Sequence, residues 1–138
     1  MIVFNYETPF ELPNEIQTQE WIQKVVADNG FEIGEINYVF CDDNYLHKLN
    51  VEFLKHDTLT DIISFDNTLG KLISGDIFIS IERVEENAKD FKVSFENELH
   101  RVMIHGVLHY MGFKDKSDDD KIKMRNAENA ALSFLKYR

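Results

Sequence analysis

The amino-acid sequence predicts an α+β domain in which a small mixed β-sheet packs against about five helices. Three observations favour this class. The 138 residues suffice for a single domain, spanning 1–138, with a sizeable core. The hydrophobic fraction of 43% is typical of a packed globule and not of a disordered chain. Strand patterns gather in the first part of the chain and helical patterns in the second.

The first part is expected to begin with a strand over residues 2–7. A helix then begins near Pro13-Asn14 and ends at Asn29-Gly30, because turn-forming residues bound an apolar repeat. Residues 33–41 read as a second strand. The next helix is capped by Asp42-Asp43-Asn44. The apolar positions of the two helices are Trp21, Ile22, Val25 and Val26 in the first, and Leu46, Leu49 and Phe53 in the second.

Two β-rich runs follow, over residues 61–66 and 72–81. The turn residues Asn67-Thr68-Leu69-Gly70 join them, so an antiparallel hairpin is predicted. A short helix over 83–89 and a long helix over 94–111 come next. The last helix begins at Asp118-Asp119-Asp120 and is expected to end in Lys136 and Arg138, an arrangement of charges that suits the helix dipole.

Two histidines on the long helix, in the C-terminal half of the chain, carry the clearest chemical signal. His105 and His109 are four residues apart, so both imidazoles lie on one helix face and can bind one divalent metal. Gly112 suits a left-handed helix end that folds the chain back. Asp115 is then placed to reach the same ion. Three protein ligands leave a coordination position open, as in catalytic zinc sites.

His105 and His109 lie within about 40° of each other around the helix axis. Glu98 and Arg101 extend the same stripe toward the N-terminus of the helix. This stripe faces away from the apolar residues of the helix, so two histidines buried in the core are not expected. A pair of surface histidines without function is the plain alternative. The apolar residues are Met103, Ile104, Val107, Tyr110 and Met111.

The spacing of this motif matches that of metzincin-type metalloproteases. Those enzymes carry a glutamate as general base directly after the first histidine, and here that position is Gly106. Glycine has no group that transfers protons, so peptide hydrolysis by that route is not expected. Another hydrolase must take its base from elsewhere or use metal-bound hydroxide.

Other features of the sequence concern the compartment. Cys41 is the single cysteine, so no disulfide can form within the chain. The N-terminus has no signal-peptide pattern, and no uncharged run approaches the length of a membrane span. We therefore expect a cytoplasmic protein without membrane association. The net charge of −10 favours solubility and argues against non-specific nucleic-acid binding.

Three segments together resemble the YbeY-type rRNA maturation factors. The stretch from His105 to Asp115 is similar to their H-G-x-L-H-L-x-G-Y-D-H signature. Residues 60–65, TDIISF, look like their T-[DN]-V-L-S-F strand, and residues 75–80, GDIFIS, look like their G-D-I-x-I-S strand. Leu49-Asn50 also fits, and the agreement extends over roughly residues 35–135.

The resemblance implies a single-strand-specific, metal-dependent endoribonuclease that binds one Zn²⁺ per chain, other divalent metals being allowed. It implies ribosomal RNA as substrate, especially the 3′ end of the 16S rRNA, and the small ribosomal subunit as partner. Ribosome quality control belongs to the same expectation. An α+β fold with the metal in a cleft is implied as well.

The chain departs from the family pattern at two positions. Asp115 replaces the usual third histidine, and zinc accepts a carboxylate oxygen there. The added negative charge lowers the Lewis acidity of the ion and broadens metal choice toward manganese or magnesium. Leu54 stands where the family has an arginine, and Lys55 and His56 follow at once. A lysine is a point charge and does not reproduce the arginine fork.

The candidate catalytic residues lie around these motifs. Lys55, His56 and Arg101 are expected to offset phosphate charge. Asp61 is a candidate general base. Ser64 is expected to line the groove, together with Phe65, which would stack on an unpaired base. Structural alternatives exist for four of these residues: a turn for Asp61, the core for Phe65, and a solvated loop for Lys55 and His56.

Two other functions remain open from the sequence. One is a ribosome assembly factor with a structural metal and no catalysis, favoured by the missing arginine and the net charge of −10. The other is a metalloprotease or another small hydrolase, which Gly106 argues against.

Overall fold

One mixed sheet organises the computed structural model, which describes residues 1–135. Its strands β1 (Ile2–Tyr6), β2 (Glu32–Cys41), β3 (Ile62–Asp66) and β4 (Leu72–Ser80) lie in the order β1-β2-β4-β3. β2 pairs in parallel with both β1 and β4, and β3 pairs antiparallel with β4. The predicted hairpin and the predicted mixed sheet are therefore confirmed.

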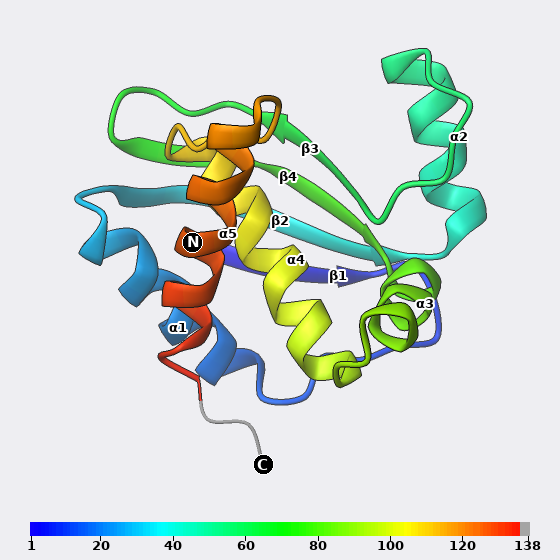
Figure 1. The fold of residues 1–138 in the computed structure, drawn as a ribbon, viewed down its shortest axis with the longest axis horizontal. Coiled ribbons are helices and arrows are strands. Elements are labelled where there is room, and N and C mark those ends of the chain that lie inside the picture. Colours follow the sequence, from blue (N-terminus) through cyan, green and yellow to red (C-terminus); the bar gives the residue numbers. More distant parts are fainter. Residues whose placement is uncertain (136–138) are drawn as a thin grey trace.

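Five helices accompany the sheet within the described residues: α1 (Glu15–Asp28), α2 (Asp43–Leu54), α3 (Ile81–Phe91), α4 (Phe95–Tyr110) and α5 (Asp118–Leu132). Helix α4 crosses the sheet and α5 lies over α4, whereas α2 stands at one end of the sheet (Figure 1). This arrangement confirms the α+β class. The last helix ends at Leu132, earlier than predicted, and Lys136 and Arg138 lie outside the described residues.

Helix α3 is longer than predicted and begins at Ile81, which the period-2 pattern assigned to a strand. The hydroxyl of Ser80 accepts a hydrogen bond from the backbone N–H of Arg83 and so caps the helix at once after β4. This N-cap satisfies one of the free N–H groups of the first turn. The local cap therefore overrides the strand alternation.

Helix α4 packs closely on the sheet because residue 106 is glycine. A Cβ atom at Gly106 would lie only 3.0 Å from Cδ1 of Ile77 and 3.2 Å from Cδ1 of Ile62. Tyr110 anchors the same helix further along, since its hydroxyl donates to the backbone oxygen of Phe65 at 2.9 Å. Gly106 therefore serves packing, and these contacts fix α4 relative to β3 and β4.

Candidate metal centre

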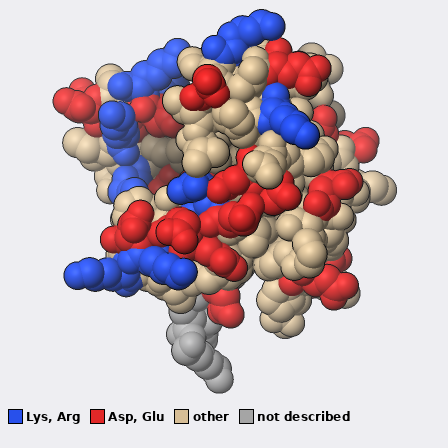
Figure 2. All heavy atoms as spheres, turned by 90° about the vertical axis from the view of Figure 1, so that its right-hand side faces the viewer, with Lys and Arg blue, Asp and Glu red and all other residues tan. Residues whose placement is uncertain are grey.

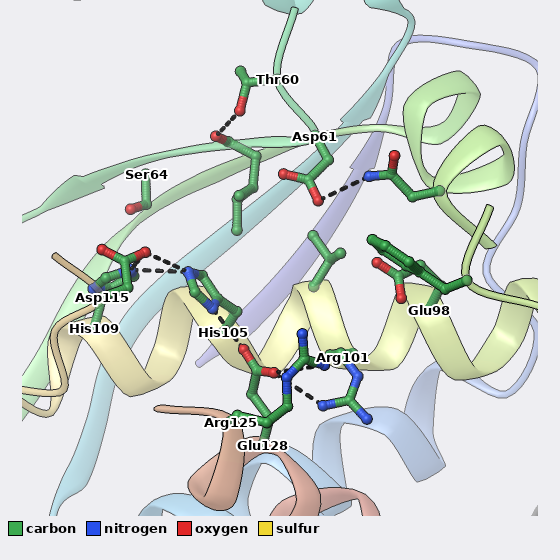
Figure 3. A pocket seen from close by; sticks show the side chains of 14 residues that line it. Thr60, Asp61, Ser64, Glu98, Arg101, His105, His109, Asp115, Arg125 and Glu128 are labelled. Carbon is green, nitrogen blue, oxygen red and sulfur yellow. Dashed lines mark hydrogen bonds and ion pairs between the residues drawn. The ribbon is translucent and has the colours of Figure 1, made fainter. Parts of the chain in front are cut away.

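Three side chains converge at the C-terminal end of α4. The Nε2 atoms of His105 and His109 are 2.9 Å apart, and each lies 3.3 Å from Oδ2 of Asp115 (Figure 3). Gly112, with φ of +99°, reverses the chain after the helix and returns Asp115 to the histidines. A tetrahedral ion with bonds of about 2.05 Å needs ligand atoms about 3.3 Å apart. The three side chains therefore form one possible metal site.

The other nitrogen of each histidine is held by a neighbour. Nδ1 of His109 donates to the backbone oxygen of Phe113 at 3.0 Å, because a carbonyl can only accept. Nδ1 of His105 lies 2.7 Å from Oε2 of Glu128. In the neutral rings both Nε2 lone pairs then face the same point, and such partners are typical around metal-binding histidines. The donor set therefore fits a divalent cation.

A cavity of about 490 Å³ adjoins this cluster. Figure 3 shows the three ligands at one end, Glu98 toward the other and Asp61 across the middle from Arg101, with Arg125 and Glu128 along the side formed by α4 and α5. A cavity of this size is typical of small-ligand sites. The open side of the metal centre therefore faces a space that can hold part of a substrate.

Glu128 of α5 links the charges of the cavity. Besides His105, it contacts Arg101 at 3.0 Å and Arg125 at 3.6 Å. Burial opposes ionisation of Glu128, but the hydrogen bonds from His105 and Arg101 lower its pKa. Burial also opposes protonation of His105, while the bond to Glu128 raises the pKa of that ring. Glu128 is therefore an ionised partner that orients His105.

Two further carboxyl groups of the cavity, those of Asp61 and Glu98, have raised pKa values. Burial raises the pKa of Asp61, although His105 and a hydrogen bond from Asn87 act in the opposite direction. Burial and the charge of Asp61 together raise the pKa of Glu98. Raised carboxyl pKa values in a cavity are characteristic of functional sites.

The structure brings some of the predicted catalytic residues to the cavity and leaves others apart. Asp61, Ser64 and Arg101 line it together with the metal ligands. Lys55 and His56 lie in the exposed segment after α2 and are not among its lining residues.

The expectation that Phe65 lines the same groove is wrong. Side chains alternate along a strand, so Phe65 points to the opposite face of β3 from Ser64. There it packs against Phe78, with ring centroids 5.8 Å apart.

Glu128 was not among the residues predicted from the sequence. It shares the buried face of α5 with apolar neighbours at helical spacing, and it is only 5% exposed. A lone carboxylate within an apolar stripe is the signal that would have found it, because such a group needs a buried partner. The apolar neighbours are Met124, Ala131 and Leu132.

The face drawn in Figure 2 carries many charged side chains. Figure 2 shows a column of Lys and Arg beside a hollow, with Asp and Glu gathered next to it. The face therefore carries both signs of charge, in keeping with the net charge of −10. No helix within residues 1–135 is long and apolar enough to cross a membrane.

Comparison with known proteins decides the family. The profile described as endoribonuclease YbeY matches residues 4–136. The chain belongs to the YbeY endoribonuclease family. The YbeY resemblance of the three motifs is thereby confirmed, and the chain is a member of a family of RNA-cleaving hydrolases.

Several YbeY relatives match over nearly their whole length. The endoribonuclease YbeY of Flavobacterium johnsoniae is 62% identical, over 98% of this chain and 97% of its own. That of Bacteroides thetaiotaomicron is 45% identical over 86% of each chain. A Thermotoga maritima protein solved in solution superposes with a TM-score of 0.67 at 25% identity, covering 97% of this chain and 91% of its own. The fold is thus shared with a solved structure.

Proposed function

We propose that residues 1–138 form a metal-dependent endoribonuclease that cleaves single-stranded RNA with one Zn²⁺ bound by His105, His109 and Asp115. The observation that carries the proposal is the convergence of three potential ligand atoms within 3.3 Å of one another on the wall of a cavity that also holds Arg101 and Arg125. Relatives named endoribonuclease YbeY support RNA as the substrate.

The biological setting follows from the family. We infer that the substrate is ribosomal RNA, with processing of the 16S rRNA 3′ end and ribosome quality control as the roles. The small ribosomal subunit is then the partner and the cytoplasm the compartment. The full-length matches to YbeY proteins support this assignment.

The chain's own residues supply most of the remaining chemistry. When bound, the metal polarises a phosphate oxygen or activates water. Arg101 and Arg125 offset the charge of the phosphate. Asp61 lines the same cavity and is the candidate general base, because a raised pKa makes its carboxylate a stronger base. Ser64 lines the wall opposite the helix and can donate a hydrogen bond to the substrate.

Lys55 and His56 act outside the cavity in this proposal. Their exposed position suits contacts with phosphates further along a strand. The ammonium group of Lys55 is exposed and donates to the backbone oxygen of Glu52 at 3.3 Å. Leu54 precedes them at the position of the family arginine.

A second candidate is a ribosome assembly factor whose metal is structural. The ion pair between Arg101 and Glu128 favours it, since an arginine that is already neutralised offers less to a phosphate. Leu54 at the position of the family arginine also favours the assembly factor, because it leaves one cation fewer for the phosphate.

Metal content and RNA cleavage, measured on the same samples, separate these candidates. Wild type should contain about one zinc and cleave single-stranded RNA while sparing the duplex. His109→Ala should lose both metal and cleavage. His47→Ala, which removes an exposed histidine of α2, is the matched control and should keep both. A metal-free His109→Ala that cleaves like wild type would contradict the metal mechanism, and an intact metal without cleavage would favour the assembly factor.

A further inference from the structure

One end of the cavity carries a carboxylate that lacks a partner within the described residues. Glu98 is only 5% exposed, yet its side chain lines the cavity and has no hydrogen bond or ion pair there (Figure 3). An unpaired buried carboxylate is costly. A ligand that brings N–H donors into the cavity would remove that cost.

Glu98 faces an acceptor on one side and cations on another, since the charge of Asp61 raises its pKa and the charges of Arg101 and Arg125 lower it. Asp61 projects from the segment before β3, and the side-chain amide of Asn87 donates to its Oδ2 at 3.4 Å. That bond uses one N–H of Asn87, so its second N–H and its carbonyl oxygen are both left for a ligand. The carboxylate of Glu98 therefore matches a neutral ligand edge that carries N–H donors, and Asn87 can add both a donor and an acceptor.

An aromatic ring completes the arrangement. Phe91, the last residue of α3, lines the same cavity and is 61% exposed, although large apolar side chains usually avoid water. Unpaired bases stack on such rings. A metal ion is a poorer fit, because the described residues contain one cluster of potential metal ligands, and it is the centre at His105, His109 and Asp115.

We propose that Glu98, Asn87 and Phe91 form a nucleobase subsite that selects guanine in single-stranded RNA. This inference rests on the proposed function for its substrate class. Guanine presents N1–H and N2–H side by side on its Watson–Crick edge, and one carboxylate can accept both. Adenine and cytosine offer a single amino group beside an acceptor, and uracil a single N–H between two carbonyls. The shared cavity places the selected base next to the phosphate at the metal centre.

Binding of 2′-O-methyl pentanucleotides to the metal-loaded protein tests the subsite, and gel electrophoresis after each measurement verifies that the probes are uncleaved. Fluorescence anisotropy compares UUGUU, UUAUU, UUCUU and UUUUU. Wild type should bind UUGUU about tenfold more tightly than UUUUU, the discrimination typical of one bidentate contact to a base. An inosine probe, which lacks the N2 amino group, should fall between the two.

Variants then assign the preference to Glu98. Glu98→Gln should lose the guanine preference, because an amide replaces one acceptor oxygen with a donor. Glu96→Gln removes the same charge from an exposed position on the same helix and should keep the preference. Phe91→Ala should weaken all four probes alike, since stacking tolerates every base.

The outcomes separate this inference from the nuclease proposal. Equal affinity of wild type for all four probes would overturn the subsite, even where single-stranded RNA is cleaved. A guanine preference that persists in Glu98→Gln would overturn the role of Glu98. If the preference is present but no RNA is cleaved, the subsite stands and the proposed nuclease activity fails. Because the wild-type comparison needs no variant, the test does not depend on the folding of Glu98→Gln.

Discussion

Glu128 lies 2.7 Å from Nδ1 of His105, although the two residues are 23 positions apart and belong to different helices. The contact fixes the ring so that its Nε2 faces His109 and Asp115. It also ties α5 to the metal centre, because the same carboxylate contacts Arg101. The metal site is thus supported by a helix that contributes no ligand of its own.

The first prediction concerns this contact. Glu128→Gln keeps the shape of the side chain but removes its charge, so it weakens the bond that orients His105. Metal affinity should fall about 10- to 100-fold, as for other partners of metal-binding histidines. Competition with a chromogenic chelator measures it. Glu20→Gln, on the exposed side of α1, is the control for the loss of one charge, and equal affinity in both variants would refute the orienting role.

The second prediction concerns the unusual third ligand. Asp115→Ala leaves two histidines, and zinc content should drop well below one per chain. Asp115→His restores the ligand type of the family signature and should retain zinc while reducing binding of manganese, since imidazole is a poorer ligand for manganese than carboxylate. Mass spectrometry of samples loaded with both metals provides the comparison. Full zinc content in Asp115→Ala would exclude Asp115 as a ligand.

The third prediction concerns the position that holds the general base in metzincins. Gly106→Glu should not create a protease, because the new side chain would collide with Ile77 and Ile62 where α4 packs on the sheet. It should lower the melting temperature, since overpacking costs about 1–3 kcal/mol and a buried carboxylate adds to that cost. Gly106→Ala should cause a smaller loss. A Gly106→Glu protein as stable as wild type would contradict the close packing.

The fourth prediction concerns pH and Glu98. Burial raises the pKa of Glu98 above its ordinary value of 4.5 in the folded protein. The folded state then binds the proton more tightly than the unfolded chain, so stability is lost as the pH rises from about 4.5 through the raised pKa. Gln cannot ionise, so the melting temperature of Glu98→Gln relative to wild type should increase from about pH 4 to about pH 7.

Thermal melts at several pH values check this expectation, with Glu96→Gln as the charge-matched control. A difference between Glu98→Gln and wild type that does not change with pH would refute the buried, unpaired state of Glu98. The result bears on burial alone, so it is independent of any RNA binding.

The local parts of the metal centre were readable from the sequence. The spacing of His105 and His109 fixes their common helix face, because the helical repeat is the same in every context. Gly112 adopts the left-handed conformation that its position after the helix indicates. The β3–β4 hairpin was equally clear from its turn residues and its alternation. The boundary between β4 and α3 at Ile81 was not clear from the sequence, because the Ser80 cap competes with the strand pattern.

What surrounds the metal centre was decided by tertiary structure alone. Packing of α5 on α4 brings Glu128 to His105, and packing of α4 on the sheet places Glu98 and Asp61 at one cavity. The same packing leaves Lys55 and His56 outside the residues that line that cavity. Periodicity along the chain specifies which side of an element is apolar, but not which distant element covers it. The ligands follow from local geometry, whereas their partners and the shape of the substrate site depend on how the apolar faces pack together.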